Sequence, residues 1–158
     1  MKQLTIAQLV TTLNSESQSL ETFIELLKKE QSMLVENVSD QLIALSEQKT
    51  TQAIKLNDLA QSRRTLLQKN ISSLNVDSIN AWLKNNCPDG LIIWQKILVQ
   101  AENSQQLNQT NGELIQMKLR HNQQSLAVLS SAYNKANLYG PDGQTSFTPS
   151  NGRSLGSV

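Results

Sequence analysis

The segment LIIWQKILVQAENSQQLNQTNGELIQMKLRHNQQSLAVLSSAY, residues 91–133, carries the most regular apolar pattern of the chain. Steps of three and four residues run through it, which is the spacing of one face of a helix that packs on a neighbour. A helix of this length extends roughly 65 Å at about 1.5 Å per residue, more than a compact domain needs. We therefore expect part of this apolar stripe to stay accessible. Its predicted positions are Leu91, Trp94, Leu98, Ala101, Gln105, Asn108, Gly112, Ile115, Leu119, Asn122, Leu126, Leu129 and Tyr133.

Two more helices with the same spacing are predicted upstream. A break at residues 38–40 separates them, and Ser39 or Asp40 is expected to cap the second one. Because the connection is short, the two helices should form an antiparallel hairpin. Lys49 and Arg63 should lay their stems on the apolar surface and keep their charges in water. The first seam is Ile6, Leu9, Leu13, Glu16, Leu20, Phe23, Leu27, Glu30 and Leu34; the second is Leu42, Leu45, Lys49, Gln52, Leu56, Leu59, Arg63 and Leu66.

A short amphipathic helix is predicted between the hairpin and the long C-terminal helix. Asn75–Ser78 resembles a helix cap, and Pro88 and Asp89 suit the start of the next helix. The predicted fold class is all-α: an elongated antiparallel helical hairpin or bundle of three long helices, a short connecting helix and a flexible C-terminal tail. The expected domains are a helical domain over residues 1–136 and an arm with a mostly disordered tail over residues 137–158.

The stretch LYGPDGQTS, residues 138–146, predicts the end of the long helix. Proline fixes φ, Asp142 bonds its own backbone and Gly143 accepts a positive φ, so this stretch should form a turn. Leu138 and Tyr139 then lie on a short arm. The arm is open to two interpretations, a frayed end packed on the bundle or a peptide that docks on a partner.

Composition excludes several classes of function. A hydrophobic share of 38% with 4% aromatics suits a thin core between paired helices. The net charge of +1 without a basic block argues against nucleic-acid binding. The single Cys87 cannot form an internal disulfide, and neither a signal peptide nor a bilayer span is present in the sequence pattern. We therefore expect a cytoplasmic protein without stable membrane insertion.

No constellation of residues predicts catalysis, a cofactor or a metal site. His121 has no second His or Cys at ligand spacing and is expected on the surface. Cys87 has no partner base, so we interpret it as a structural thiol. Trp82 and Trp94 should pack the short helix against the long one. The protein is therefore predicted not to be an enzyme.

The apolar stripe of residues 91–133 has three open interpretations. It is the protein's own core, the seam of a homo-oligomer, or a groove that receives a helix from another protein through anchors at i, i+3, i+4 and i+7. Periodicity alone does not separate them. A structural coiled-coil or homodimeric spacer without cargo therefore stands as the alternative to a binding protein.

Three blocks of residues resemble the FlgN family of flagellar type III export chaperones. They are Leu107–Gly112 (LNQTNG), Arg120–Leu129 (RHNQQSLAVL) and Leu138–Ser146 (LYGPDGQTS), in the family's order and spacing. The first two helices match the family in pattern rather than in residues. Nothing is carried over for the tail after Ser146.

The resemblance implies a chaperone that binds the C-terminal helical segments of the hook–filament junction proteins FlgK and FlgL. It would prevent their premature assembly and deliver them to the export gate, and association with the export-apparatus protein FliJ is also a family trait. The family's gate-docking tyrosine corresponds to Tyr139, preceded by Leu138, and its target is FlhA. The expected cargo anchors are Ile115, Leu119, Leu126 and Leu129, and Asn108, Asn111 and Asn122 are expected to fix the register of the cargo.

Overall fold

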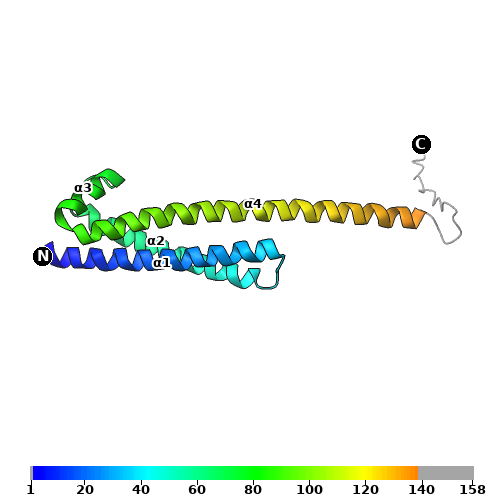
Figure 1. Ribbon diagram of the computed structural model, residues 1–158, viewed down its shortest axis with the longest axis horizontal. Helices are drawn as coiled ribbons and strands as arrows, with labels where there is room; N and C mark the ends of the chain where they lie inside the picture. Colours follow the sequence, from blue (N-terminus) through cyan, green and yellow to red (C-terminus); the bar gives the residue numbers. More distant parts are fainter. Residues whose placement is uncertain (1, 139–158) are drawn as a thin grey trace, which may run out of the picture. The chain divides into compact units, whose positions relative to one another are not determined.

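The computed structural model describes residues 2–138 and the side chains of residues 5–136. Over this range the chain forms helices only: α1 (Lys2–Glu36), α2 (Leu42–Gln68), α3 (Val76–Asn86) and α4 (Pro88–Leu138) (Figure 1). The predicted all-α class, with three long helices and a short one, is confirmed. The predicted turn and tail lie outside the described residues, so the domain boundary after residue 136 stays a prediction.

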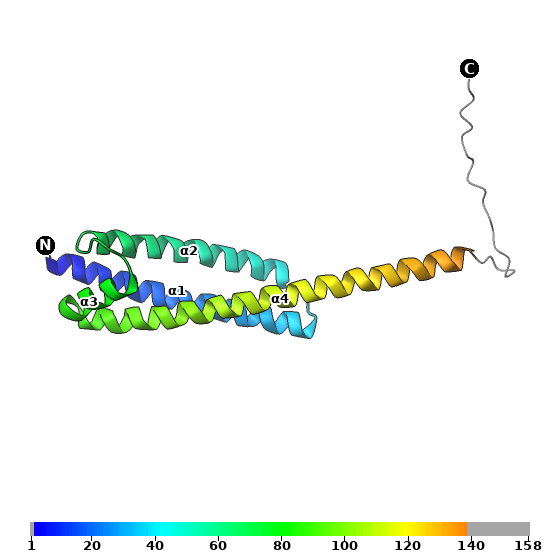
Figure 2. The same cartoon turned by 90° about the horizontal axis from the view of Figure 1, so that it is seen from above.

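The chain divides into two units, residues 1–115 and residues 116–158. The first unit holds α1, α2, α3 and α4 up to Ile115, and the described part of the second is the rest of α4. In the first unit α1, α2 and the beginning of α4 lie side by side (Figure 2). The predicted antiparallel hairpin of α1 and α2 is present. The chain returns through α3, so this part of α4 runs parallel to α1.

The predicted seam of α1 is confirmed almost position by position. Ile6 and Phe23 are half-buried, and the other seven positions are buried. Each seam position of α2 is also buried or half-buried. Both helices therefore follow the steps of three and four that their sequences carry.

The turn between α1 and α2 differs from the prediction. Asn37 has a φ of 58°, and the Val38 N–H donates to the Met33 carbonyl at 3.0 Å, which closes α1 in the Schellman manner. The N-cap of α2 is Gln41, whose side chain makes no capping bond, so the predicted cap at Ser39 or Asp40 is wrong. The left-handed residue at Asn37 terminates α1 and lets the chain reverse without a side-chain cap on α2.

The densest part of the core lies where α3 closes one end of the bundle. The Asn75 side chain caps α3 by accepting from the Ser78 N–H at 2.7 Å, as predicted. Trp94 is buried and Trp82 is half-buried against the same cluster. The buried cluster consists of Leu9, Leu13, Leu20, Leu67, Ile79, Leu83, Cys87, Trp94 and Ile97.

The predicted seam of α4 is wrong in its middle. The side chains of Ala101, Gln105 and Asn108 are exposed. The buried positions lie one residue earlier and are Ile97, Gln100, Ser104 and Asn111, with Leu107 half-buried. Hydrophobic periodicity missed this register because three of these buried residues are polar. Polar side chains of this kind are buried only where they find hydrogen-bond partners.

The glycines at the two ends of the bundled part of α4 have opposite surroundings. A Cβ on Gly90 would come within 2.8 Å of Cys87 Sγ, which makes glycine necessary there. A Cβ on Gly112 would meet no atom within 4 Å, so no close approach of another segment requires glycine there. Gly112 thus carries only the entropic cost of glycine in a helix.

We predict that Gly112→Ala stabilises the protein by about 1 kcal/mol, because alanine restricts the unfolded chain and fits the space. Gly90→Ala should destabilise it by about 1–3 kcal/mol through overpacking against Cys87. Urea denaturation followed by circular dichroism measures both. Equal stabilisation by the two changes would contradict the assigned difference in surroundings.

Candidate functional site

A buried ion pair joins α1 and α2 and lies beside α4. Arg63 Nε donates to Glu16 Oε2 at 2.8 Å, and Arg63 Nη2 donates to Glu16 Oε1 at 3.1 Å. Only 11% of the Arg63 side chain and 6% of the Glu16 side chain are exposed. The guanidinium also lies 4.6 Å from the centre of the Trp94 ring on α4. This arrangement links α1, α2 and α4 at one level of the bundle.

A second polar cluster lies further along the bundle. Lys49 Nζ donates to both carboxylate oxygens of Glu30, at 2.9 and 3.0 Å. Asn111 Nδ2 donates to Glu30 Oε2 and to the Leu27 carbonyl, both at 2.8 Å. Asn108 Oδ1 accepts a longer bond of 3.4 Å from Lys49 Nζ. The charges of Lys49 and Arg63 are therefore paired across helices, and the expectation that water alone surrounds them is wrong.

Uncharged polar contacts lie between these two clusters. Ser17 Oγ donates to Gln100 Oε1 at 2.9 Å, and both residues are buried. Gln52 Nε2 donates to Ser19 Oγ at 2.6 Å and to the Ser19 carbonyl at 3.0 Å. Each contact fixes the level of one helix against another, because a shift along the axis would leave buried polar groups unpaired.

One sequence signal could have revealed the two ion pairs. The residue numbers of Glu16 and Arg63 add to 79, and so do those of Glu30 and Lys49. A constant sum is what an antiparallel hairpin requires of residues at the same level. The acidic interruptions of one predicted seam thus face the basic interruptions of the other.

The candidates for chemistry that the sequence offers, His121 and Cys87, lie in different surroundings. Between residues 2 and 138 no group of three or more His, Cys, Asp and Glu side chains could hold a metal ion. His121 is exposed as predicted, and Cys87 is buried within the core cluster. None of the described helices is long and apolar enough to cross a membrane.

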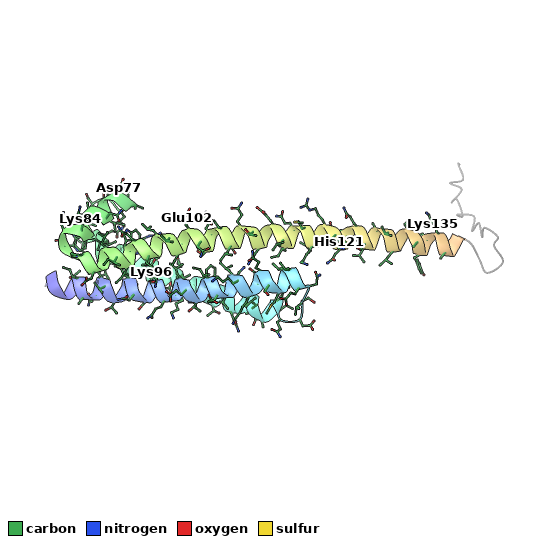
Figure 3. The ribbon with its side chains drawn as sticks, viewed as in Figure 1. Asp77, Lys84, Lys96, Glu102, His121 and Lys135 are labelled. Atoms are coloured by element: carbon green, nitrogen blue, oxygen red, sulfur yellow. The ribbon has the colours of Figure 1, made fainter. Side chains whose placement is uncertain are left out.

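The second unit presents an apolar face on its described helix. Leu119, Leu126, Leu129 and Tyr133 are 55%, 66%, 65% and 69% exposed. Together with exposed Asn122 they keep the spacing of three and four that lines one side of a helix. Figure 3 labels His121 and Lys135 on the same segment. We call Leu119, Asn122, Leu126, Leu129 and Tyr133 the exposed stripe.

The predicted cargo residues therefore fall into different environments. Asn111 is 1% exposed and bonded within the first unit, so its expected place on an accessible surface is wrong. Asn108 is exposed but contacts Lys49, and Ile115 is 38% exposed at the end of the first unit. The remaining four residues, Leu119, Asn122, Leu126 and Leu129, belong to the exposed stripe.

The predicted gate-docking residues lie at the limit of the structure. Leu138 is the last residue of α4, and its side chain is outside the described set. Tyr139 lies outside the described residues. Their role stays a prediction.

Comparisons with known proteins agree on one family. A family model described as FlgN protein matches residues 1–146. A flagella synthesis protein FlgN of Yersinia enterocolitica is 32% identical over 153 residues, covering 96% of this chain and 98% of that protein. The flagella synthesis protein FlgN of Salmonella typhimurium is 32% identical over 94% of this chain and 92% of its own length. The Escherichia coli protein of that name is 39% identical over 62 residues, covering 39% of this chain and 44% of its own length. No solved structure matches the chain.

We predict that Arg63→Ala destabilises the protein by about 3 kcal/mol, because it leaves the buried Glu16 carboxylate unpaired. Replacing both partners, Glu16→Leu with Arg63→Leu, should recover most of this loss. The control is Lys28→Ala, which breaks an exposed pair with Glu25 and should cost less than about 0.5 kcal/mol. Denaturation of the three variants and of the wild type measures these differences. Similar losses for Arg63→Ala and Lys28→Ala would contradict a structural role of the buried pair.

Proposed function

The chain belongs to the FlgN family, and from this membership we propose that it is a cytoplasmic flagellar export chaperone. Its proposed cargo is the C-terminal helical segments of the junction proteins FlgK and FlgL. Binding covers these segments before assembly, and the complex is then delivered to the type III export gate. The protein acts by binding and not by catalysis.

The exposed stripe is the observation that supports a binding role. Three leucines and a tyrosine lie on one face of the helix between residues 119 and 133 and remain largely in contact with water. A helix that exposes apolar residues at i, i+3 and i+7 is suited to receive an amphipathic helix from another chain. The four apolar side chains of the stripe are each exposed, so they do not contribute to a core in the second unit.

Reversible binding fits a cargo that is disordered before assembly. Folding such a segment on the chaperone costs on the order of 2–5 kcal/mol, which lowers the affinity that the contacts alone would provide. A moderate affinity allows the gate to remove the cargo. The bundle of residues 1–115 has its own core and polar contacts, so cargo release need not unfold it.

The gate contact is proposed on the resemblance alone. Leu138 and Tyr139 occupy the positions of the family's Leu-Tyr-Gly motif, and we assign them to docking on FlhA. FliJ is included as a further export-apparatus partner on the same ground.

A structural spacer that dimerises through α4 is the second candidate. The spacing of the exposed stripe favours it, because steps of three and four also suit pairing with a second copy. Sedimentation at two protein concentrations, with and without a FlgK C-terminal peptide, separates the candidates. The spacer dimerises with concentration and ignores the peptide, whereas the chaperone stays monomeric and binds it.

We predict that Leu119→Ala combined with Leu126→Ala weakens binding of a FlgK or FlgL C-terminal peptide by roughly 30-fold, through lost apolar contact. The matched control is Met117→Ala with Val128→Ala, since both side chains are exposed and lie away from the stripe. Calorimetry with each peptide measures the affinities. Equal effects of the two double changes would exclude the stripe as the cargo site.

For Tyr139→Ala we predict normal folding and normal cargo affinity, with binding to FlhA reduced at least about tenfold. Co-purification with FlhA and with cargo peptide measures the two interactions separately. Loss of helical content in this variant would instead support the packing of Tyr139 on the bundle.

A further inference from the structure

One residue of the exposed stripe is polar. Asn122 lies between Leu119 and Leu126 and is seven residues before Leu129, so it occupies a seam position and not a flank. A polar amide in an otherwise apolar seam weakens pairing with leucine, because its donors and acceptors lose water without gaining a partner. In coiled coils such an asparagine selects register and partner at a cost in stability.

The flanks of the stripe carry one charge, that of Lys118, which lies four residues before Asn122 on the same side of the helix. The neighbouring positions hold Gln123, Ser125, Ser130 and Ala132. Arg120 lies about 100° around the helix from Leu119, and Lys135 lies about 200° from Tyr133, so neither belongs to the stripe. Lys118, before Leu119, is partly buried and already has an interaction partner. Packing and Asn122 are therefore the means of discrimination that this face offers.

The size of the stripe argues against a second copy as its stable occupant. Covering the exposed parts of its four apolar side chains removes on the order of 500 Å² of this helix from water. A stable dimer buries about 800 Å² on each subunit. The area of the stripe alone suits a transient complex with a helical segment that binds and dissociates.

We propose that Asn122 is the specificity-determining residue of the exposed stripe. The stripe accepts one amphipathic helical segment of another chain whose apolar seam carries a single amide or hydroxyl side chain facing Asn122. This inference rests on the proposed function for the source of the segment and adds the chemistry by which it is chosen. Because Lys118 is the one charge on the flanks and already has an interaction partner, the selection depends little on salt.

The test uses the full chain and two synthetic amphipathic peptides of three heptads. One peptide has leucine at every seam position, and the other has one asparagine at the central seam position. Wild type should prefer the asparagine peptide by roughly tenfold, which corresponds to about one well-paired buried amide. This preference should change less than about twofold between roughly 50 and 500 mM salt.

Asn122→Leu should abolish or reverse the preference. The matched control is Gln124→Leu, which adds the same side chain at an exposed position two residues further and about 200° around the helix. The control should keep the preference.

The outcomes also separate this inference from the proposed function. If the asparagine peptide is preferred but FlgK and FlgL segments do not bind, the chaperone assignment fails and the role of Asn122 stands. The proposal for Asn122 is overturned if wild type binds neither peptide, binds both equally or is already dimeric. Retention of the preference in Asn122→Leu overturns it as well.

Discussion

The bidentate contact between Glu16 and Arg63, with Trp94 beside it, is the interaction on which the level of the three long helices depends. The core contains few aromatic residues, and leucine seams can interlock at several offsets along the helix axis. Apolar packing alone therefore resists the sliding of one helix along another only weakly. The Glu16 and Arg63 side chains are both nearly buried, so their ion pair allows no such offset. Sliding one helix by a turn would leave a carboxylate or a guanidinium buried without its partner. The Glu30 cluster repeats this constraint further along α1, so the hairpin and the first part of α4 are held at two separate levels.

The two units of the chain share α4, which has a different role in each. Up to Asn111, α4 contributes the buried amides of Gln100 and Asn111, which bond to α1, and its surface is used by the bundle. Between residues 119 and 133 its apolar side chains are exposed, and Asn122 is the polar exception. A helix in a globular protein usually covers its apolar side, as the first part of α4 does with Trp94 and Ile97. The exposed apolar face of residues 119–133 departs from this pattern and is consistent with the proposed role, in which the second unit receives a helical segment of another chain.

The candidate site was predictable only in part. Exposure of Leu119, Leu126 and Leu129 agrees with the expectation, drawn from the length of the helix, that part of the long seam stays accessible. The accessible place expected for Asn111 was wrong. Its amide finds the Leu27 carbonyl and the Glu30 carboxylate, and such partners come from a segment more than 80 residues away. The missed contacts of Gln100 and Ser17 have the same origin, since hydrophobic spacing contains no information about which polar groups meet.

The sequence by itself determined the helical class, the seams of α1 and α2, the antiparallel hairpin and the cap of α3 at Asn75. These follow from local rules, namely residue spacing and the hydrogen bond between a side chain and a nearby backbone N–H. Only the tertiary structure decided the register of α4, the αL turn at Asn37 in place of a capped start of α2, and the burial of the ion pairs of Lys49 and Arg63, whose matching levels the antiparallel seams already contained. The physical reason is common to the α4 register and the ion pairs. The cost of burying a polar group is set by its partners, and for these side chains the partners lie on other helices.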